Sequence, residues 1–291
     1  MTFVIKILIL WDDQFYFGFK NKLEQLHDLI QKHPIAGCMN RIQDILTFFD
    51  KQRCHQTLSK ENILTPKGVY DVCSYQDLRE KMKLEDLKNV FIKTRFGSGA
   101  SGIVALKTNG AKLHSLSTVE QHNGRFYNTR RLQRSNNETE VSSLIDSLCK
   151  WGVHCESWVP KAIIDKKESD CRILLIDGKA DFFVLRKSNT PITNLHLMNE
   201  RAKIQELVDS MVDGAWAQVL NTCEKLAALY PKSFHIAADI AVHKNLREHS
   251  VLELNAFGDF LQNISHEGMN TYAWQLQQFN VIQDRIYSGV S

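Results

Sequence analysis

The chain has 291 residues, of which 43% are hydrophobic and 24% are charged. This composition is that of a globular protein and excludes a disordered or collagen-like chain. Lysine and arginine outnumber aspartate and glutamate by only 36 to 33, and such a small excess argues against a nucleic-acid partner. The length predicts about two domains.

The sequence also carries signals about location. No wholly apolar run approaches the ~20 residues that a membrane-spanning helix needs, so we expect no membrane association. Residues 1–10 contain one charge and no small-residue cleavage site, which predicts a first strand over 4–10 instead of a signal peptide. The seven cysteines form no Cys-x-x-Cys pair, which is typical of buried thiols in a reducing compartment. We therefore expect a cytoplasmic protein.

Strand-like and helix-like segments follow one another along the chain. Ser74 and Asn137 are suited to cap two of the helices. Predicted strands after 4–10 cover 68–70, 90–93, 103–106, 113–120, 125–129, 172–176, 182–186, 235–242 and 250–254. Predicted helices cover 19–31, 43–58, 75–82, 138–148, 215–230 and 272–287.

Two dipeptides predict hairpins between consecutive strands. Asn123-Gly124 indicates a type I′ turn, and Asp177-Gly178 likewise indicates a hairpin. Because hairpins recur and the chain lacks a simple β–α–β alternation, we assign it to the α+β class with antiparallel sheets.

A strand that ends in Lys93 runs into a loop of small residues, and a second strand follows. Glycines let main-chain N–H groups approach phosphate oxygens closely, and serine hydroxyls add donors. The loop differs from a Walker A loop and from a Rossmann fingerprint because no helix follows it. It is either a phosphate-binding loop or an ordinary flexible hairpin loop. Its residues are Gly97, Ser98, Gly99, Ala100, Ser101 and Gly102.

Acidic residues stand inside two apolar strands of the C-terminal half. Asp239 lies in the first, and Glu253 and Asn255 share one face of the second, with Leu254 pointing away. Carboxylate and amide oxygens suit Mg²⁺ that is shared with phosphates. The alternative is a set of solvated strand ends, although a glutamate among apolar strand residues is costly without a partner. We take Asp239, Glu253 and Asn255 as candidate metal ligands.

A third polar group comprises Asp170, Arg172 and Arg186. Arg186 ends a predicted strand, so its guanidinium can reach a pocket and stabilise a transferring phosphoryl group. Arg172 has an alternative interpretation as the partner of Asp170 in a surface ion pair, which would contribute under ~1 kcal/mol. For His196 we favour a structural role.

Four arginines and two aromatic residues fall within residues 125–134. Such a segment can bind an acidic peptide, a phosphate or a nucleic acid. It can also be a solvated hairpin edge whose charges prevent strand addition, and this is the interpretation that we favour.

The order of these motifs resembles that of the ATP-grasp superfamily over residues 50–260. The sequence Asp170-Cys171-Arg172, followed by Arg186 and Asn194-Leu195-His196, is similar to the ribosomal-protein-S6 glutamate-ligase branch and to neighbouring peptide-modifying ligases. That branch continues with glycines where this chain has Leu197-Met198-Asn199. The remaining motifs are Asp50-Lys51, Val90-Phe91-Ile92-Lys93, the small-residue loop, Glu156-Ser157-Trp158-Val159-Pro160, Asp239 and Glu253-x-Asn255.

The resemblance implies an ATP-grasp fold, in which two α+β lobes with antiparallel sheets hold ATP between them. We expect an abridged N-terminal α/β segment over residues 1–50, a small lobe over 51–155 and a large lobe over 156–291. Many superfamily members have a longer N-terminal domain. Substrate contacts would therefore come here from a homodimer partner, from residues 107–136, or from a peptide substrate itself.

The resemblance also implies an ATP- and Mg²⁺-dependent ligase with one or two Mg²⁺ ions. A carboxylate of an amino acid or peptide would attack the γ-phosphorus to give an acylphosphate, and an amine would then displace phosphate. The alternatives are a phosphotransferase to a hydroxyl acceptor and a non-catalytic nucleotide-binding partner of an enzyme complex. The implied residues are nucleotide contacts at Lys51, Lys93, 97–102, Glu156, Trp158 and Val159, catalytic groups at Arg172 and Arg186, and metal ligands at Asp239, Glu253 and Asn255.

Overall fold

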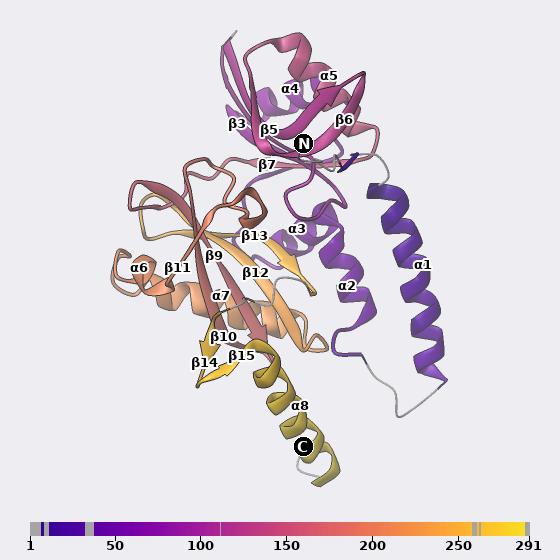
Figure 1. The fold of residues 1–291 in the computed structure, drawn as a ribbon, viewed down its shortest axis with the longest axis vertical. Coiled ribbons are helices and arrows are strands. Elements are labelled where there is room, and N and C mark those ends of the chain that lie inside the picture. Colours follow the sequence, from indigo (N-terminus) through magenta and orange to yellow (C-terminus); the bar gives the residue numbers. More distant parts are fainter. Residues whose placement is uncertain are drawn as a thin grey trace, which may run out of the picture.

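The computed structural model describes residues 7–8, 12–32, 38–110, 112–257, 261 and 263–288. Two antiparallel sheets form two lobes, one above the other in Figure 1. The helix α3 (Lys51–Lys60) contacts a strand of each lobe. The α+β class with antiparallel sheets is confirmed. The predicted first strand is described only as β1 (Ile7–Leu8), and the rest of residues 4–10 lies outside the described residues.

The upper lobe contains a seven-stranded sheet in the order β1-β6-β5-β4-β3-β7-β2. The helices α4 (Tyr75–Leu84) and α5 (Glu138–Cys149) cover one face of this sheet and form a hydrophobic core with it. The remaining strands are β2 (Gly68–Val69), β3 (Asn89–Thr94), β4 (Ile103–Asn109), β5 (Lys112–His122), β6 (Arg125–Ser135) and β7 (Val153–Ser157).

Alternation along β3 decides which side chains leave this core. Val90 and Ile92 pack under the helices, so Phe91 and Lys93 point to the opposite face, toward the lower lobe. Strand β7 repeats the pattern, because its apolar side chains pack in the core while His154 and Glu156 take the other face. The helix-free face of the upper sheet is therefore where polar groups gather.

The lower lobe contains a second sheet in the order β11-β10-β9-β12-β13, with β8 paired to β9. The helix α7 (Ala215–Leu229) covers one face of it, together with α2 (Ile42–Phe49) and α3. The strands are β8 (Ile163–Ile164), β9 (Lys167–Ile176), β10 (Lys179–Ser188), β11 (Glu200–Ala202), β12 (His235–Val242) and β13 (His249–Asn255).

Smaller elements complete the chain. Helix α1 (Asp12–Gln31) lies beside α2, at the right of the lower lobe in Figure 1, and α8 (Thr271–Ser288) extends below the lower sheet. The others are the 3₁₀ helix η1 (Leu195–Leu197), α6 (Ile204–Val208), β14 (Ser265–His266) and β15 (Met269–Asn270).

The predicted helix over 43–58 is in fact two helices, α2 and α3, which meet at Asp50. This residue has an extended backbone (φ −89°, ψ 94°), and its side chain accepts a hydrogen bond from the Arg53 N–H at 3.0 Å. Aspartate is among the preferred N-cap residues, so it starts a new helix where apolar periodicity alone predicts continuation. Helix α3 contributes Cys54 and Leu58 to the core of the lower sheet.

Local signals elsewhere in the sequence are confirmed. Ser74 accepts a hydrogen bond from the Asp77 N–H and caps α4, and Asn137 caps α5 through two main-chain N–H groups. Both residues of Asn123-Gly124 have positive φ (49° and 73°), as a type I′ turn between β5 and β6 requires. Asp177-Gly178 forms the equivalent turn between β9 and β10.

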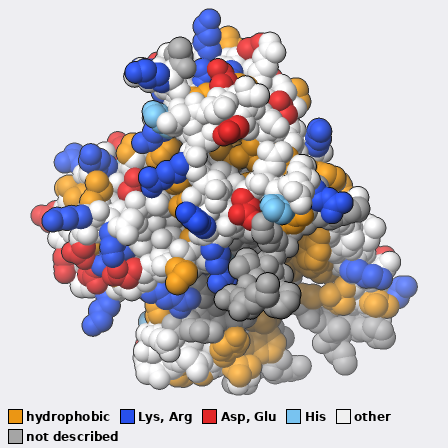
Figure 2. Space-filling model, turned by 45° about the horizontal axis from the view of Figure 1, so that its top comes forward, with side chains coloured by type: hydrophobic (Ala, Val, Ile, Leu, Met, Phe, Trp, Pro, Cys, Tyr) orange, Lys and Arg blue, Asp and Glu red, His pale blue; other side chains and the backbone are white. Residues whose placement is uncertain are grey.

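The molecular surface carries both charges. Figure 2 shows lysine and arginine side chains spread over the visible face, without a single basic stripe. Among the described residues, no helix combines the length and apolar character needed to cross a membrane.

Candidate functional site

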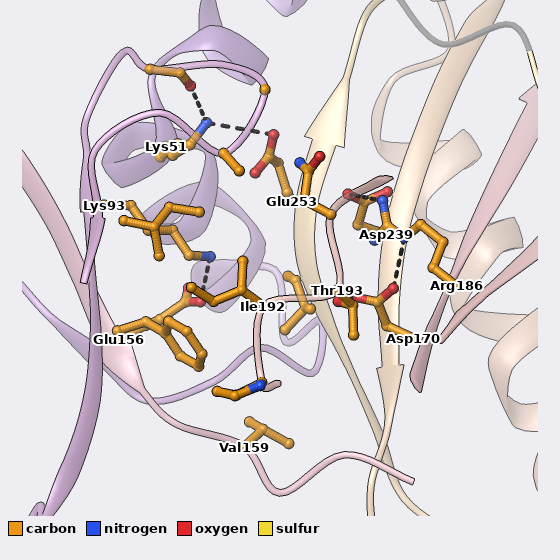
Figure 3. A pocket seen from close by; sticks show the side chains of 18 of the residues that line it. Lys51, Lys93, Glu156, Val159, Asp170, Arg186, Ile192, Thr193, Asp239 and Glu253 are labelled. Carbon is orange, nitrogen blue, oxygen red and sulfur yellow. Dashed lines mark hydrogen bonds and ion pairs between the residues drawn. The ribbon is translucent and has the colours of Figure 1, made fainter. Parts of the chain in front are cut away.

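The facing sides of the two sheets enclose a cavity of about 90 Å³ (Figure 3). Lys93 and Glu156 reach it from the upper sheet, and Asp170, Arg186 and Asp239 reach it from the lower sheet. Its wall also includes Lys51, residues 97–101, Val159, Lys161, Ile192, Thr193 and Glu253. Most of the predicted site residues therefore line one cavity.

A buried hydrogen-bonded chain in the upper lobe, the Lys93 cluster, comprises Lys93, Glu156 and His154. Lys93 Nζ donates to Glu156 Oε1 at 2.5 Å, and His154 Nε2 lies 3.0 Å from Glu156 Oε2. Burial opposes charge on both Lys93 and Glu156, but their mutual attraction outweighs it, so the pKa of Lys93 is raised and that of Glu156 is lowered. Both oxygens of Glu156 are thus bound to protein groups.

The hydrogen bonds fix the tautomers of two neighbouring histidines. His55 Nε2 lies 2.7 Å from the Pro66 carbonyl, which can only accept, so Nε2 carries the proton and Nδ1 accepts from the Tyr70 hydroxyl at 2.8 Å. His154 Nε2 donates to Glu156, and its buried Nδ1 has no partner among the described residues. Burial lowers the pKa of His55 to about 4 and also lowers that of His154.

His55, His154 and Glu156 lie close enough together to suggest a metal site, with one ligand atom from each within 4.8 Å of the others. Lys93 already occupies one oxygen of Glu156, and both ring nitrogens of His55 are hydrogen-bonded. The hydrogen bonds therefore explain this grouping without a cation.

The lower lobe contributes a closed ionic network, the Arg186 network, formed by Asp170, Arg172, Arg186 and Asp239. Arg186 donates to Asp170 at 2.7 Å and to Asp239 at 3.1 Å, and Arg172 donates to both oxygens of Asp239 at 2.7 and 2.9 Å. Burial raises the carboxyl pKa values, but the arginines outweigh it, and the pKa values of Asp170 and Asp239 are lowered.

Strand register brings these four residues together. Arg186 on β10 is paired with Asp170 on β9, and Arg172 on β9 is paired with Asp239 on β12. The surface ion pair considered between Arg172 and Asp170 does not form, because Arg172 binds Asp239 instead and its side chain is 13% exposed. Two of the five N–H donors of Arg186 are committed to carboxylates, which leaves others for a ligand.

The three candidate metal ligands lie on adjacent strands. Asp239 is paired with Glu253 in the β12–β13 register, and Leu254 is buried in the core while Glu253 and Asn255 stay half-buried on the other face. Asp239 already accepts three hydrogen bonds, so about one of its roughly four lone-pair sites remains.

The side chain of Asn255 indicates whether a cation fits between the three candidate metal ligands. Its amide nitrogen is buried and has no hydrogen-bond partner among the described residues. The oxygen and nitrogen of an amide are nearly indistinguishable in shape, so a flipped amide would turn its oxygen to the same unfilled position. Together with Asp239 and Glu253, this donor set suits a hard cation such as Mg²⁺.

Lys51 links the small-residue loop to this strand. Its Nζ donates to the Gly97 carbonyl at 2.7 Å and lies 3.4 Å from Glu253 Oε1. The preceding Asp50 binds Arg95, at the stem of the loop, through two hydrogen bonds of 2.7 Å. The loop is therefore fixed at its stem and reaches the cavity with residues 97–101.

Four predicted site residues lie outside the lining of this cavity. Gly102 has φ +62°, and a Cβ atom there would approach Thr94 Cγ2 to 2.3 Å, so its position demands glycine for packing. Trp158 donates its main-chain N–H to the Asn89 carbonyl at 3.0 Å. Lys107 Nζ lies over its ring, 4.2 Å from the centroid, and the Phe91 ring packs against it at a tilt. Arg172 and Asn255 line a second, adjacent cavity.

Sequence reasoning missed Lys161 and gave no role to Thr193. Lys161 Nζ donates to Thr193 Oγ1 at 2.6 Å and to Asp170 at 3.0 Å, and Thr193 also donates to Asp170. No local pattern could identify Lys161, because its partners come from β9 and from the loop after β10. His154 was identifiable, because its i, i+2 spacing places it beside Glu156 on one strand face.

No protein-family model matches the sequence, and a search among curated proteins finds no match either. Solved structures do resemble the chain. D-cycloserine synthetase DcsG shares 10% identity over 92% of this chain and 80% of its own, with a TM-score of 0.58. N5-carboxyaminoimidazole synthetase from Staphylococcus aureus, complexed with ADP, shares 12% identity over 82% of this chain and 51% of its own (TM-score 0.54). D-alanine–D-alanine ligase from Bacillus anthracis shares 12% identity over 82% of this chain and 66% of its own (TM-score 0.52).

These likenesses define the fold: the chain has the ATP-grasp fold, as the motif order predicted. The chain spans less than two thirds of the length of two of the three solved chains. At 10% and 12% identity the likeness extends to the architecture and to nothing finer.

Proposed function

We propose that the protein is an ATP- and Mg²⁺-dependent carboxylate–amine ligase that forms an amide through an acylphosphate. The observation that carries the proposal is the cavity in which two lysines, the small-residue loop, Arg186 and two of the three candidate metal ligands, Asp239 and Glu253, meet. The shared fold with two synthetases and a ligase supports the same class of reaction.

The nucleotide would lie between the sheets, with its base against Phe91, Ile192 and Val159 and its phosphates toward Lys51 and Lys93. The adenine contact at Glu156 would be made by the main chain, since both carboxylate oxygens are taken by Lys93 and His154. The present cavity of about 90 Å³ is smaller than the ~300–1,000 Å³ of typical ligand sites. ATP entry would therefore require the tip of the loop, residues 98–101, to move away from the lower lobe.

Asp239, Glu253 and Asn255 would hold Mg²⁺, which supplies charge neutralisation on the phosphate oxygens when bound. Arg186 adds fixed positive charge at the same end of the cavity, and the two aspartates that grip it keep its guanidinium in one orientation. Arg172 acts through Asp239, whose carboxylate it holds by two hydrogen bonds.

In the first step a carboxylate oxygen of the substrate attacks the γ-phosphorus, the bond to the β-phosphate oxygen breaks, and ADP leaves. In the second step an amine attacks the acyl carbon, loses a proton, and displaces inorganic phosphate to give an amide. The acylphosphate hydrolyses in water, so residues 97–101 would have to cover it between the steps.

Replacement Glu253→Gln tests the proposal. Glu253 is partly exposed and has one long ion pair with Lys51, so the fold should stay intact, whereas loss of a metal-binding charge worth about 3 kcal/mol would lower kcat ~100-fold. Asp239→Asn is a poorer test, because it also removes the negative charge with which two buried arginines, Arg172 and Arg186, are paired.

The assay measures ADP and free phosphate released from ATP with amino-acid and peptide pools, and Glu224→Gln, on the exposed face of α7, is the matched control. A ligase releases both products. ADP without free phosphate would indicate a phosphotransferase, and full activity of the Glu253→Gln variant would show that the metal site is misplaced.

A further inference from the structure

A second and larger cavity of about 720 Å³ opens beside the first. Seven residues line both cavities, so the two are continuous at the end where the phosphates would lie. The shared residues are Lys51, Gly97, Ser98, Gly99, Arg186, Asn194 and Glu253. The ATP-binding interpretation uses only the edge of this second cavity.

The end of the second cavity that adjoins the first is basic. Arg172, Arg186, Arg201 and Lys51 line it together with Glu253. Asp170 and Asp239 bind two of the arginines, so four positive groups meet three negative ones. Arg201 on β11 is paired with Arg186 on β10, which sets the two guanidinium-bearing positions side by side. An anionic group such as a carboxylate is therefore complementary to this end.

Another part of the lining of the second cavity, the aromatic wall, is formed by phenylalanines. It includes Phe15 from α1, Phe49 from the end of α2, and Phe257, which follows the candidate metal ligand Asn255 by two residues. The rings of Phe49 and Phe257 lie 5.4 Å apart, and Phe19 joins them at 4.9 Å from Phe49 and 6.2 Å from Phe15. These contacts hold the wall in place before any ligand binds.

The aromatic wall is also exposed. Phe15 and Phe257 are 65% and 48% exposed, and a group of neighbouring exposed apolar side chains, unlike a single one, is typical of a binding surface. A ligand that buries both rings while its charge stays at the arginines would use the whole length of the cavity.

We propose that the acid activated by this protein carries a large apolar or aromatic side chain, either as a free amino acid or as the end of a peptide. Its carboxylate lies at the arginine end, beside Glu253 and the phosphates, and its side chain packs on Phe15, Phe49 and Phe257. The proposal deepens the proposed ligase function and rests on it.

The proposed packing predicts a measurable preference for acids with an aromatic side chain. Burial of an aromatic side chain is worth several methylene groups, and one methylene in an apolar pocket already discriminates by ~10-fold or more. We expect kcat/KM for phenylalanine to exceed that for alanine and for glutamate by at least ~10-fold.

The experiment traps the acylphosphate with hydroxylamine, so that the natural amine need not be known. The full chain, ATP and Mg²⁺ are incubated with phenylalanine, alanine, glutamate or the dipeptide Ala-Phe, and hydroxamate and ADP are measured. The ratio between phenylalanine and Ala-Phe tells whether the acid is free or a peptide end.

Phe257→Ala and Phe15→Ala replace exposed side chains, so both variants should fold. Each is expected to raise KM for the aromatic acid ~10-fold or more, with kcat and the KM for ATP unchanged. Phe279→Ala on α8, also exposed and outside the second cavity, is the control and should change nothing.

Two failures are distinguishable. Faster hydroxamate formation from alanine or glutamate, unaffected by Phe257→Ala, would overturn the side-chain assignment and leave the ligase reaction standing. No hydroxamate from any acid would overturn the ligase reaction and this inference with it.

Discussion

Two buried charged clusters face the same cavity from opposite lobes, and they are built differently. In the upper lobe the Lys93 cluster is an open chain that ends in a neutral histidine, whose Nδ1 has no hydrogen-bond partner in the part of the chain that the structure describes. We call the Arg186 network of the lower lobe closed in the sense that it consists only of charged groups, each bound to an oppositely charged one. Each carboxylate binds an arginine, and Arg186 joins both carboxylates.

The difference between the two clusters bears on how each lobe would hold a charged ligand. A closed network of permanent charges keeps its geometry whether or not a ligand is present, and this suits residues that position a cation. An open chain that ends in a neutral histidine holds one lysine in place, but its stability depends on pH.

The largest expected effect comes from opening the closed network. Arg186→Met leaves Asp170 and Asp239 buried with fewer positive partners, and breaking such a pair typically costs about 3–5 kcal/mol of unfolding free energy. Urea denaturation measures the change. Arg131→Met, at an exposed position of β6, is the control and should stay within about 0.5 kcal/mol. Equal unfolding free energies of the Arg186→Met and Arg131→Met variants would contradict the contribution of the Arg186 network to stability.

A smaller effect is expected in the upper lobe. Lys93→Met leaves Glu156, which is 2% exposed, with only His154, and should cost about 3 kcal/mol. The double variant Lys93→Met/Glu156→Gln removes the stranded charge and should recover part of that loss, with a coupling of about 1–3 kcal/mol. Additive losses in the double-mutant cycle would mean that the pair does not interact as described.

His55, whose ring lies beside that of His154, and the Arg186 network should also respond to acid in different pH ranges. The pKa of His55 is about 4 in the folded chain and ~6.5 unfolded, so the unfolded state takes up a proton first as pH falls. The histidine contribution is therefore lost between about pH 6.5 and 4, whereas the lowered aspartate pKa values keep the Arg186 network intact until about pH 4 and below.

His55→Gln isolates the histidine effect. In the variant, the slope of unfolding free energy against pH between 6.5 and 4 should fall by up to about 1.4 kcal/mol per pH unit. Urea titrations at several pH values measure it, with the exposed His122→Gln as control. An unchanged slope would show that His55 has the same pKa in the folded and the unfolded chain.

The parts of the fold that local chemistry determines were predictable from the sequence. Asn123-Gly124 and Asp177-Gly178 form the expected hairpins, and Ser74 and Asn137 cap the expected helices. The break at Asp50 was missed because apolar periodicity runs through it, and only its cap hydrogen bond and its ion pair with Arg95 reveal the boundary.

The candidate site was predictable as a set of residues but not as a set of contacts. Motif order and alternation brought Lys93, Arg186, Asp239 and Glu253 to one cavity. The partner of Arg172 is Asp239 and not its near neighbour Asp170, because strand register between β9 and β12, which no sequence pattern gives, decides the pairing. The nucleotide, metal and catalytic roles of these residues stay predictions.

The anchoring of the small-residue loop has a mechanical consequence. Arg95 is clamped by Asp50, and the Gly97 carbonyl is held by Lys51, so the stem is pinned to the junction of α2 and α3. Left-handed backbone angles occur beyond that point, at Gly99 and Ala100. Any movement of the loop is therefore confined to residues 98–101. These residues are held at both ends, because Lys51 binds the Gly97 carbonyl and Gly102 leads directly into β4.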